Sequence, residues 1–323
     1  MLRGISSVGD WKSAEIDKRC MNAFIASIIG NADFGSRGPS FHKAGYKYAN
    51  YPKFNIRDET EESDEVAKPD VLLYNVSKKC ALLIEVKGED SIGTDRHLRQ
   101  LKRNKSVGEA DVEKLVKAID CEVTIDNLIT GIVYREETVQ KCYQSQTCFQ
   151  KLNQMQQDYL VCTQRRGGYL KALNPQAIVI DDELRGFLTN GIPIPKKPKI
   201  RMYVTENPCV KGIMYGILDY IQDEFFSEGK IQPTGENREI FLTTVFLKDE
   251  VFKEPHVNSD NIATALRELK TLGFCTYTGK KPRFGFQWKR FNRLMSSDRR
   301  QETINKINSL DCSNPSKTLD STY

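Results

Sequence analysis

The sequence lacks several features that would place it in common protein classes. It has no uninterrupted apolar run of about 18 residues, which a membrane-spanning helix needs, and its start shows no apolar stretch behind basic residues. We therefore expect a protein that is neither secreted nor embedded in a membrane. The three histidines, at 42, 97 and 256, are scattered along the chain, so a histidine-based metal centre is not expected.

The cysteines carry no recognisable spacing. There are nine of them, an odd number without a Cys-x-x-Cys pair, which argues against both a disulfide framework and a zinc ribbon. Cys142 and Cys148 are expected to lie in one helix, at a spacing that is not typical of a metal site. This usage predicts a reducing compartment, the cytoplasm or the nucleus.

Length and charge set wider limits. A chain of 323 residues is long enough for about two domains with cores of their own. The net charge of +5 is compatible with a polyanionic partner such as nucleic acid without requiring one.

The most informative stretch covers residues 68–87. Two apolar runs, 71–76 and 80–86, flank the polar break 77–79, a pattern that predicts a β-hairpin. A symmetric turn centred between Ser77 and Lys78 places Asp70 opposite Glu85, and residues opposite each other project from the same face. Lys87 follows Glu85 by two residues, so it points to that face as well. The hairpin therefore predicts a cluster of two carboxylates and one ammonium.

Such a cluster has a chemical use. Two carboxylates on rigid strands can hold Mg²⁺ or Mn²⁺, and the metal can activate water and polarise a phosphate. Lys87 could orient the attacking water or stabilise the transition state. The alternative is a structural ion pair or solvent-facing side chains. Against that alternative, both faces of the hairpin are apolar, and burying charge without a function is costly.

Pro69-Asp70 followed by Glu85-Val86-Lys87 resembles the signature of the PD-(D/E)xK nuclease superfamily, which has the restriction-endonuclease-like fold. The resemblance covers roughly residues 10–135 and implies an α/β (α+β) core, in which helices flank a central mixed sheet. It also implies that Asp70 and Glu85 bind a divalent metal, that the Val86 carbonyl is a further ligand, and that Lys87 is the catalytic lysine.

Two helices around this motif carry further candidate residues. In the resembled superfamily the first helix often adds an acid to the site, and Glu15 is the matching position here; a solvated partner for Lys18 or Arg19 is the alternative. On the predicted helix 94–105, we expect Arg96, Arg99 and Lys102 to contact phosphate, or else to form a solvated face. Further on, a helix at 110–119, a strand at 128–134 and a helix over 137–163 are expected.

The composition changes at residues 191–200, which are rich in proline and lysine and predict a stiff linker. We therefore expect a nuclease-like domain at 1–190, a second domain at 201–295 and a polar, frayed tail at 296–323.

The second domain is predicted to be a winged helix. Expected helices cover 209–226, 239–252 and 262–272, and a hairpin with a basic turn at 279–282 covers 274–288. From 259 to 293 the sequence has eight Lys or Arg against two acids, which favours DNA binding by the third helix and the wing. A winged helix used for protein contacts is the alternative. The expected DNA-contacting residues are Arg267, Lys270, Lys280, Lys281 and Arg283.

These expectations combine into one hypothesis: a Mg²⁺- or Mn²⁺-dependent DNA endonuclease whose winged helix binds the target. A catalytically inactive DNA- or partner-binding protein and an RNA endonuclease are the alternatives. Because many enzymes of the resembled fold cut both strands as dimers, a homodimer is one arrangement that the resemblance suggests.

Overall fold

The computed structural model describes residues 8–29, 38–50, 52–56, 65–119, 123–195, 209–227, 239–252, 257–278 and 283–310. The chain divides into two compact units, one of residues 19–200 and one of residues 1–18 together with 201–323. The division after residue 200 falls at the end of the expected linker. Helix α1 (Val8–Ile29) contributes to both units, so residues 1–18 do not group with the domain in which we expected them.

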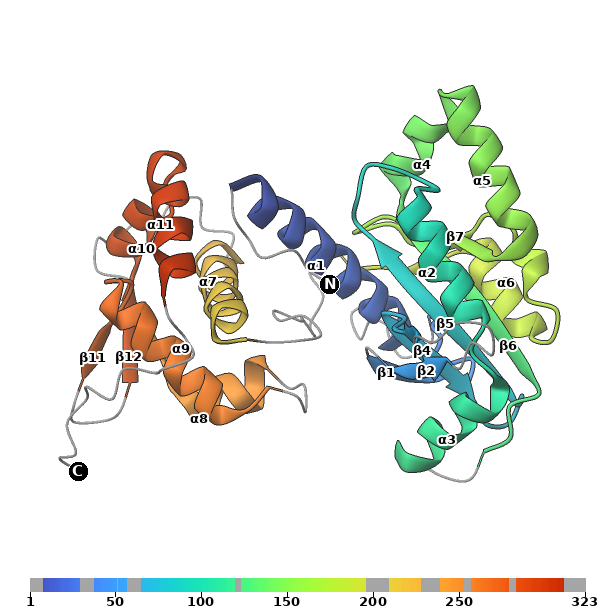
Figure 1. Cartoon of the computed structure of the whole chain (residues 1–323), viewed down its shortest axis with the longest axis horizontal. Coiled ribbons are helices and arrows are strands. Elements are labelled where there is room, and N and C mark those ends of the chain that lie inside the picture. The colour runs from blue at the N-terminus through green and yellow to red at the C-terminus, as the bar shows by residue number, and fades with distance from the viewer. Residues whose placement is uncertain are drawn as a thin grey trace. The chain divides into compact units, whose positions relative to one another are not determined.

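A mixed sheet of seven strands forms the centre of the unit of residues 19–200, and helices flank it (Figure 1). The strand order is β1-β4-β5-β6-β7-β8-β9, and β2 (Phe54–Ile56) pairs separately with β3 (Glu65–Ala67). Neighbouring strands are antiparallel, except that β5, β6 and β7 run parallel. The seven strands are β1 Lys47–Asn50, β4 Val71–Asn75, β5 Cys80–Lys87, β6 Asn127–Arg135, β7 Leu160–Gln164, β8 Tyr169–Ala172 and β9 Ile192–Pro193.

Burial explains why β5 carries a continuous apolar run. All of its residues are buried, as expected for a strand covered on both faces. The helices that follow it bring the chain back, so that β6 can pair with β5 in parallel. Helix α3 packs on β4 and β5, while α2, α4 and α5 pack on β6 and β7. The helices of this unit are α2 Asp95–Lys105, α3 Glu109–Ile119, α4 Glu136–Tyr143, α5 Gln146–Asp158 and α6 Asp182–Asn190, with a 3₁₀ turn η2 at Pro175–Ala177.

The helix expected over 137–163 is wrong in two places. It is divided into α4 and α5, and its last residues form β7. The hydroxyl of Ser145 accepts a hydrogen bond from the backbone of Cys148 and caps a new helix start. The run Leu160–Gln164 pairs with β6, because tertiary context decides between strand and helix for short apolar runs.

The break between α4 and α5 brings two cysteines close together. A disulfide links Cys142 of α4 to Cys148 of α5, so the expectation that both cysteines lie in one helix is wrong. In one continuous helix, six residues would separate the two cysteines by about 9 Å along the axis. Because α5 folds back after α4, their Cα atoms lie 5.2 Å apart instead.

The C-terminal unit combines helices with a three-stranded antiparallel sheet of order β10-β12-β11. One core of buried apolar residues joins α7, α9, the sheet and α11. The elements are α7 Val210–Ser227, β10 Glu239–Leu242, α8 Thr244–Phe246, a π-helical turn η3 Leu247–Val251, α9 Ser259–Thr271, β11 Thr276–Thr278, β12 Arg283–Gln287, α10 Trp288–Leu294 and α11 Ser297–Ser309.

Two expectations for this unit are corrected. The helix predicted over 239–252 begins with β10, which pairs along its length with β12. The polar tail predicted from 296 contains α11, whose Ile304 and Ile307 are fully buried. The segment is polar on average, but these two isoleucines lie three residues apart on one helix face and dock in the core.

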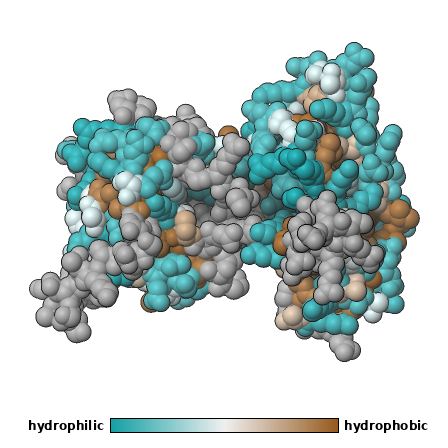
Figure 2. All heavy atoms as spheres, in the orientation of Figure 1, coloured by the Kyte–Doolittle hydropathy of each residue, from teal (hydrophilic) through white to brown (hydrophobic). Residues whose placement is uncertain are grey.

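On the face drawn in Figure 2, the described residues of each unit are largely hydrophilic, with separate apolar patches. Within the ranges that the structure describes, no helix combines the length and the apolar character that crossing a bilayer requires.

Candidate functional site

The β4–β5 hairpin has the register predicted from the sequence. Val71 pairs with Ile84 and Asn75 with Cys80, and the turn between the strands includes Lys79 in a left-handed conformation (φ 50°). Continuing this register by one residue places Asp70 opposite Glu85. The two carboxylates therefore belong to one strand pair, at the end of β5 where Lys87 also lies.

Each acidic side chain is held by a polar contact. Oδ2 of Asp70 accepts a hydrogen bond from the backbone N–H of Val86 at 2.7 Å. Oε2 of Glu85 accepts one from Nζ of Lys87 at 2.7 Å. The Val86 carbonyl is directed to the same side as its N–H, towards Asp70, because both groups of one strand residue face the same neighbour. Asp70, Glu85, Val86 and Lys87 are thus brought together.

Lys87 and Glu85 are buried, with exposed fractions of 8% and 1%. Burial by itself disfavours the ammonium, yet the negative charges of Glu85 and Asp70 outweigh it and raise the pKa of Lys87 above its ordinary value. Lys87 is therefore charged at neutral pH. Asp70 acts on this charge too, so both carboxylates lie within electrostatic reach of one ammonium.

Helix α2 adds a residue that the sequence reasoning missed. Asn104 is 1% exposed, and its Nδ2 donates a hydrogen bond to Oε1 of Glu85 at 2.9 Å. His97, Leu101 and Asn104 form the buried stripe of this helix. The spacing of these three residues along the helix can be recognised in the sequence. A buried asparagine needs a hydrogen-bond partner, so its place on this stripe could have indicated a polar group on the element that packs against α2. Gln100 also lies on α2, and its Oε1 is buried without a hydrogen-bond partner among the described residues.

A second polar group lies next to Lys87. Tyr134 of β6 pairs with Lys87 across the parallel strands, and its hydroxyl is 3.1 Å from Nδ1 of His97. Nε2 of His97 is 3.3 Å from Oε2 of Glu89, in the loop that leaves the site. Burial lowers the pKa of His97 to about 4, and the charge of Lys87 acts in the same direction. His97 is therefore neutral at pH 7.

This pKa predicts a pH dependence of stability. The pKa of His97 is about 4 in the folded chain against 6.5 for the ordinary side chain. Between these values the unfolded chain binds more protons, so the free energy of unfolding falls as the pH is lowered from about 6.5 to about 4. Replacing His97 by Asn, whose amide can reach the Tyr134 hydroxyl as Nδ1 does, is expected to flatten this decline. Urea unfolding at pH 7, 6, 5 and 4 measures it, and equal slopes for both proteins would contradict the assignment.

The basic residues expected on α2 are exposed to solvent. Arg99 and Lys102 have no ion pair among the described residues, while Arg96 contacts Glu89 at 3.4 Å and acts electrostatically on Lys87. Arg96 thus lies at the margin of the site. Phosphate contact by the three residues stays a prediction.

Glu15 has a different environment from the hairpin residues. It lies in the part of α1 that groups with the C-terminal unit, where its charge acts on Arg300. The structure therefore does not group Glu15 with the unit that holds Asp70, Glu85 and Lys87. Its role as a third acid stays a prediction.

The expected DNA-contacting residues of the C-terminal unit are described in part. On α9, the guanidinium of Arg267 bonds the Ala263 carbonyl and the Thr264 hydroxyl, and the ammonium of Lys270 lies 5.5 Å from the ring centre of Tyr277 on β11. Arg283 begins β12. Lys280 and Lys281 lie outside the described residues.

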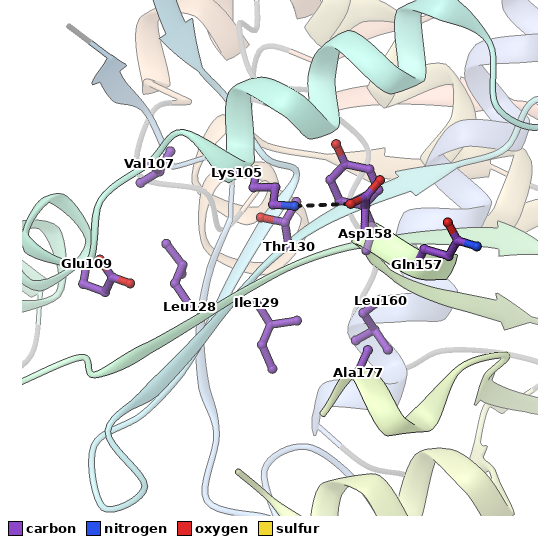
Figure 3. A pocket seen from close by; sticks show the side chains of 11 residues that line it. Lys105, Val107, Glu109, Leu128, Ile129, Thr130, Gln157, Asp158, Leu160 and Ala177 are labelled. Carbon is purple, nitrogen blue, oxygen red and sulfur yellow. Dashed lines mark ion pairs between the residues drawn. The ribbon is translucent and has the colours of Figure 1, made fainter. Parts of the chain in front are cut away.

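A pocket of about 430 Å³ lies elsewhere in the sheet unit (Figure 3). Lys105 and Asp158 form an ion pair beside Thr130, with an N–O distance of 3.6 Å. None of Asp70, Glu85, Val86 and Lys87 is among the residues that line this pocket. The pocket is therefore not the hairpin site.

The donors of the hairpin site are oxygen atoms, the kind of ligand that a hard divalent cation takes. These donors are two carboxylates and a backbone carbonyl, and Mg²⁺ binds through one or two carboxylates while keeping several waters. The site already stabilises one positive charge, that of Lys87. Among the described residues, no group of three or more His, Cys, Asp or Glu is arranged to hold a metal. The fit is thus to an open site completed by water and substrate rather than to a closed cage.

Comparison of the chain with protein-family models, with curated proteins and with solved structures gave no match.

Proposed function

We propose that the chain is a DNA endonuclease that hydrolyses phosphodiester bonds with Mg²⁺ or Mn²⁺ at the site of Asp70, Glu85 and Lys87. The observation that carries the proposal is the register of the β4–β5 hairpin. It brings two carboxylates and a charged amine to one end of one strand pair. A structural ion pair needs only one acid and one base, whereas this site adds the second carboxylate of Asp70, an oxygen donor of the kind that a divalent cation binds.

In the proposal, the residues of the site have separate roles. Asp70, Glu85 and the Val86 carbonyl would hold the metal, which when bound lowers the pKa of a water and polarises a phosphate oxygen. Lys87 donates hydrogen bonds to the attacking water or to the phosphate, where negative charge develops. Asn104 keeps the carboxylate of Glu85 in one orientation through its hydrogen bond.

The order of the elements supports a restriction-endonuclease-like core. Helix α1 is followed by the antiparallel strands β1, β4 and β5, then by helices α2 and α3, and then by β6, which is parallel to β5. This is the αβββαβ order that the resemblance to the PD-(D/E)xK superfamily implies, with β2 and β3 as an added pair. The catalytic residues of the proposal lie on its third strand and just before its second.

The C-terminal unit supports DNA as the substrate. Its order of helix α7, strand β10, the turns α8 and η3, helix α9 and strands β11 and β12 is compatible with the winged helix of the proposal. Helix α9 begins at a cap in which the Asn258 side chain accepts a hydrogen bond from the Asn261 backbone at 2.7 Å. In the proposal, α9 and the basic β11–β12 hairpin bind the duplex. The site chemistry alone would serve RNA equally well.

The test is cleavage by the purified full chain. Supercoiled plasmid and a structured RNA are incubated with the protein and Mg²⁺ or Mn²⁺, with and without an excess of EDTA. We expect nicked or linear plasmid only where free metal is present. Cleavage that persists in EDTA contradicts a metal mechanism, and cleavage of RNA alone favours an RNA endonuclease. Plasmid binding without cleavage under all conditions favours a nuclease-like binding protein.

A further inference from the structure

Two kinds of hydrogen-bond donor, neutral and charged, contact the carboxylates of Asp70 and Glu85. One oxygen of each carboxylate is fixed by a neutral donor: the Val86 N–H holds Oδ2 of Asp70, and Asn104 holds Oε1 of Glu85. The other oxygen of Glu85, Oε2, receives the ammonium of Lys87 at 2.7 Å. The neutral donors orient the two carboxylates, and the cation supplies the balancing charge.

The charges of the site explain this arrangement. Two buried or half-buried carboxylates without a cation would repel each other and would be costly to desolvate. Lys87 is 8% exposed and lies on the same strand as Glu85, so its ammonium cannot leave without leaving Glu85 uncompensated. The ammonium of Lys87 thus lowers the cost of burying the Glu85 carboxylate when no metal is bound.

We propose that Lys87 is an internal counter-ion that occupies the cation position of this site, and that a divalent metal must displace it from Oε2 of Glu85. The inference rests on the proposed function, because it assumes that Asp70 and Glu85 are metal ligands. The metal-free chain is then a closed state in which Lys87 competes with the metal for one oxygen.

The displacement of Lys87 would couple the binding of metal to the binding of nucleic acid. Once displaced, the ammonium needs another anion, and the phosphate of a bound nucleic acid provides one. Metal and nucleic acid therefore bind with positive coupling, and the coupling passes through Lys87. The site therefore binds the metal weakly in the absence of nucleic acid and tightly in its presence.

The test measures metal affinity rather than activity. Mn²⁺ binding to the full chain is followed by calorimetry in the absence of DNA. Lys87→Met, which keeps an unbranched side chain one atom shorter and removes its charge, is expected to bind Mn²⁺ at least about tenfold more tightly, because a charge-assisted hydrogen bond no longer competes. Lys114→Met, at an exposed position of α3, is the matched control and should bind like the unchanged protein. Unchanged or weaker binding by Lys87→Met overturns the proposal.

A second variant, Lys87→Gln, tests the same proposal in case Lys87→Met does not fold. Lys87→Gln retains a neutral donor, and the rise in melting temperature on adding Mn²⁺ should be larger for it than for the unchanged chain. An equal or smaller rise also overturns the proposal. If the unchanged chain binds Mn²⁺ and cleaves DNA while both variants bind no more tightly, only the counter-ion role fails. If neither the unchanged chain nor Lys87→Met binds Mn²⁺, the proposed function fails with it.

Discussion

Asp70→Asn and Glu85→Gln are each expected to lose metal-dependent DNA cleavage. Both changes keep the shape of the side chain but remove the charge that holds a hard cation. The metal contributes several kcal/mol to stabilising the charge of the transition state, and each 1.4 kcal/mol is tenfold in rate. We therefore expect cleavage rates lower by about 10³-fold or more, measured as plasmid nicking at saturating Mg²⁺.

The two variants differ in what else they disturb. In Asp70→Asn the oxygen of the new amide can still accept from the Val86 N–H, so this variant should fold as the unchanged chain does. Glu85→Gln leaves the buried ammonium of Lys87 with a weaker partner, so its melting temperature must be measured beside its activity. Asp111→Asn and Glu137→Gln, at exposed positions in the first turns of α3 and α4, are the matched controls. Variants at Asp70 and Glu85 that are folded and cleave at the unchanged rate would refute the site.

Asp181→Ala is expected to destabilise the unit of residues 19–200 strongly. Asp181 is 2% exposed, and its carboxylate accepts hydrogen bonds from Tyr46 Oη at 2.9 Å, Lys78 Nζ at 2.7 Å and the Leu184 backbone at 3.0 Å. It thereby ties the start of α6 to the turn of the hairpin. Removing it leaves the buried Tyr46 hydroxyl and the Lys78 ammonium short of a partner and removes the cap of α6. We expect a loss of about 3 kcal/mol, seen as a lower urea midpoint of this unit.

Glu183→Gln is the matched control for that experiment. Glu183 also contacts Lys78, at 3.3 Å, but its side chain is 49% exposed. Exposed ion pairs contribute between about 0 and 1 kcal/mol, so this variant should melt close to the unchanged chain. If both variants lose the same stability, the buried position of Asp181 is not what gives its contacts their strength.

Local sequence patterns were sufficient to predict the β4–β5 hairpin but not some of the other elements. The symmetric turn at 77–79 determined the register of β4 and β5, because both faces of this hairpin are apolar and the length of the connecting turn then sets which residues pair. Residues 239–242 carry an equally apolar pattern, and there the prediction of helix was wrong. Whether such a short run forms a strand depends on a partner, and β12 lies about 45 residues further along the chain.

The sequence by itself determined that Asp70, Glu85 and Lys87 share one end of a strand pair, because alternation and a symmetric turn are local properties that fix which side chains face each other. Only the tertiary structure decided what surrounds them. Asn104 reaches Glu85, and His97 reaches Tyr134, across a crossover of helices whose packing no short pattern specifies. The return of α5 along α4 and the burial of Ile304 and Ile307 in a core were also decided only by the tertiary structure. Both depend on packing that no short sequence pattern specifies.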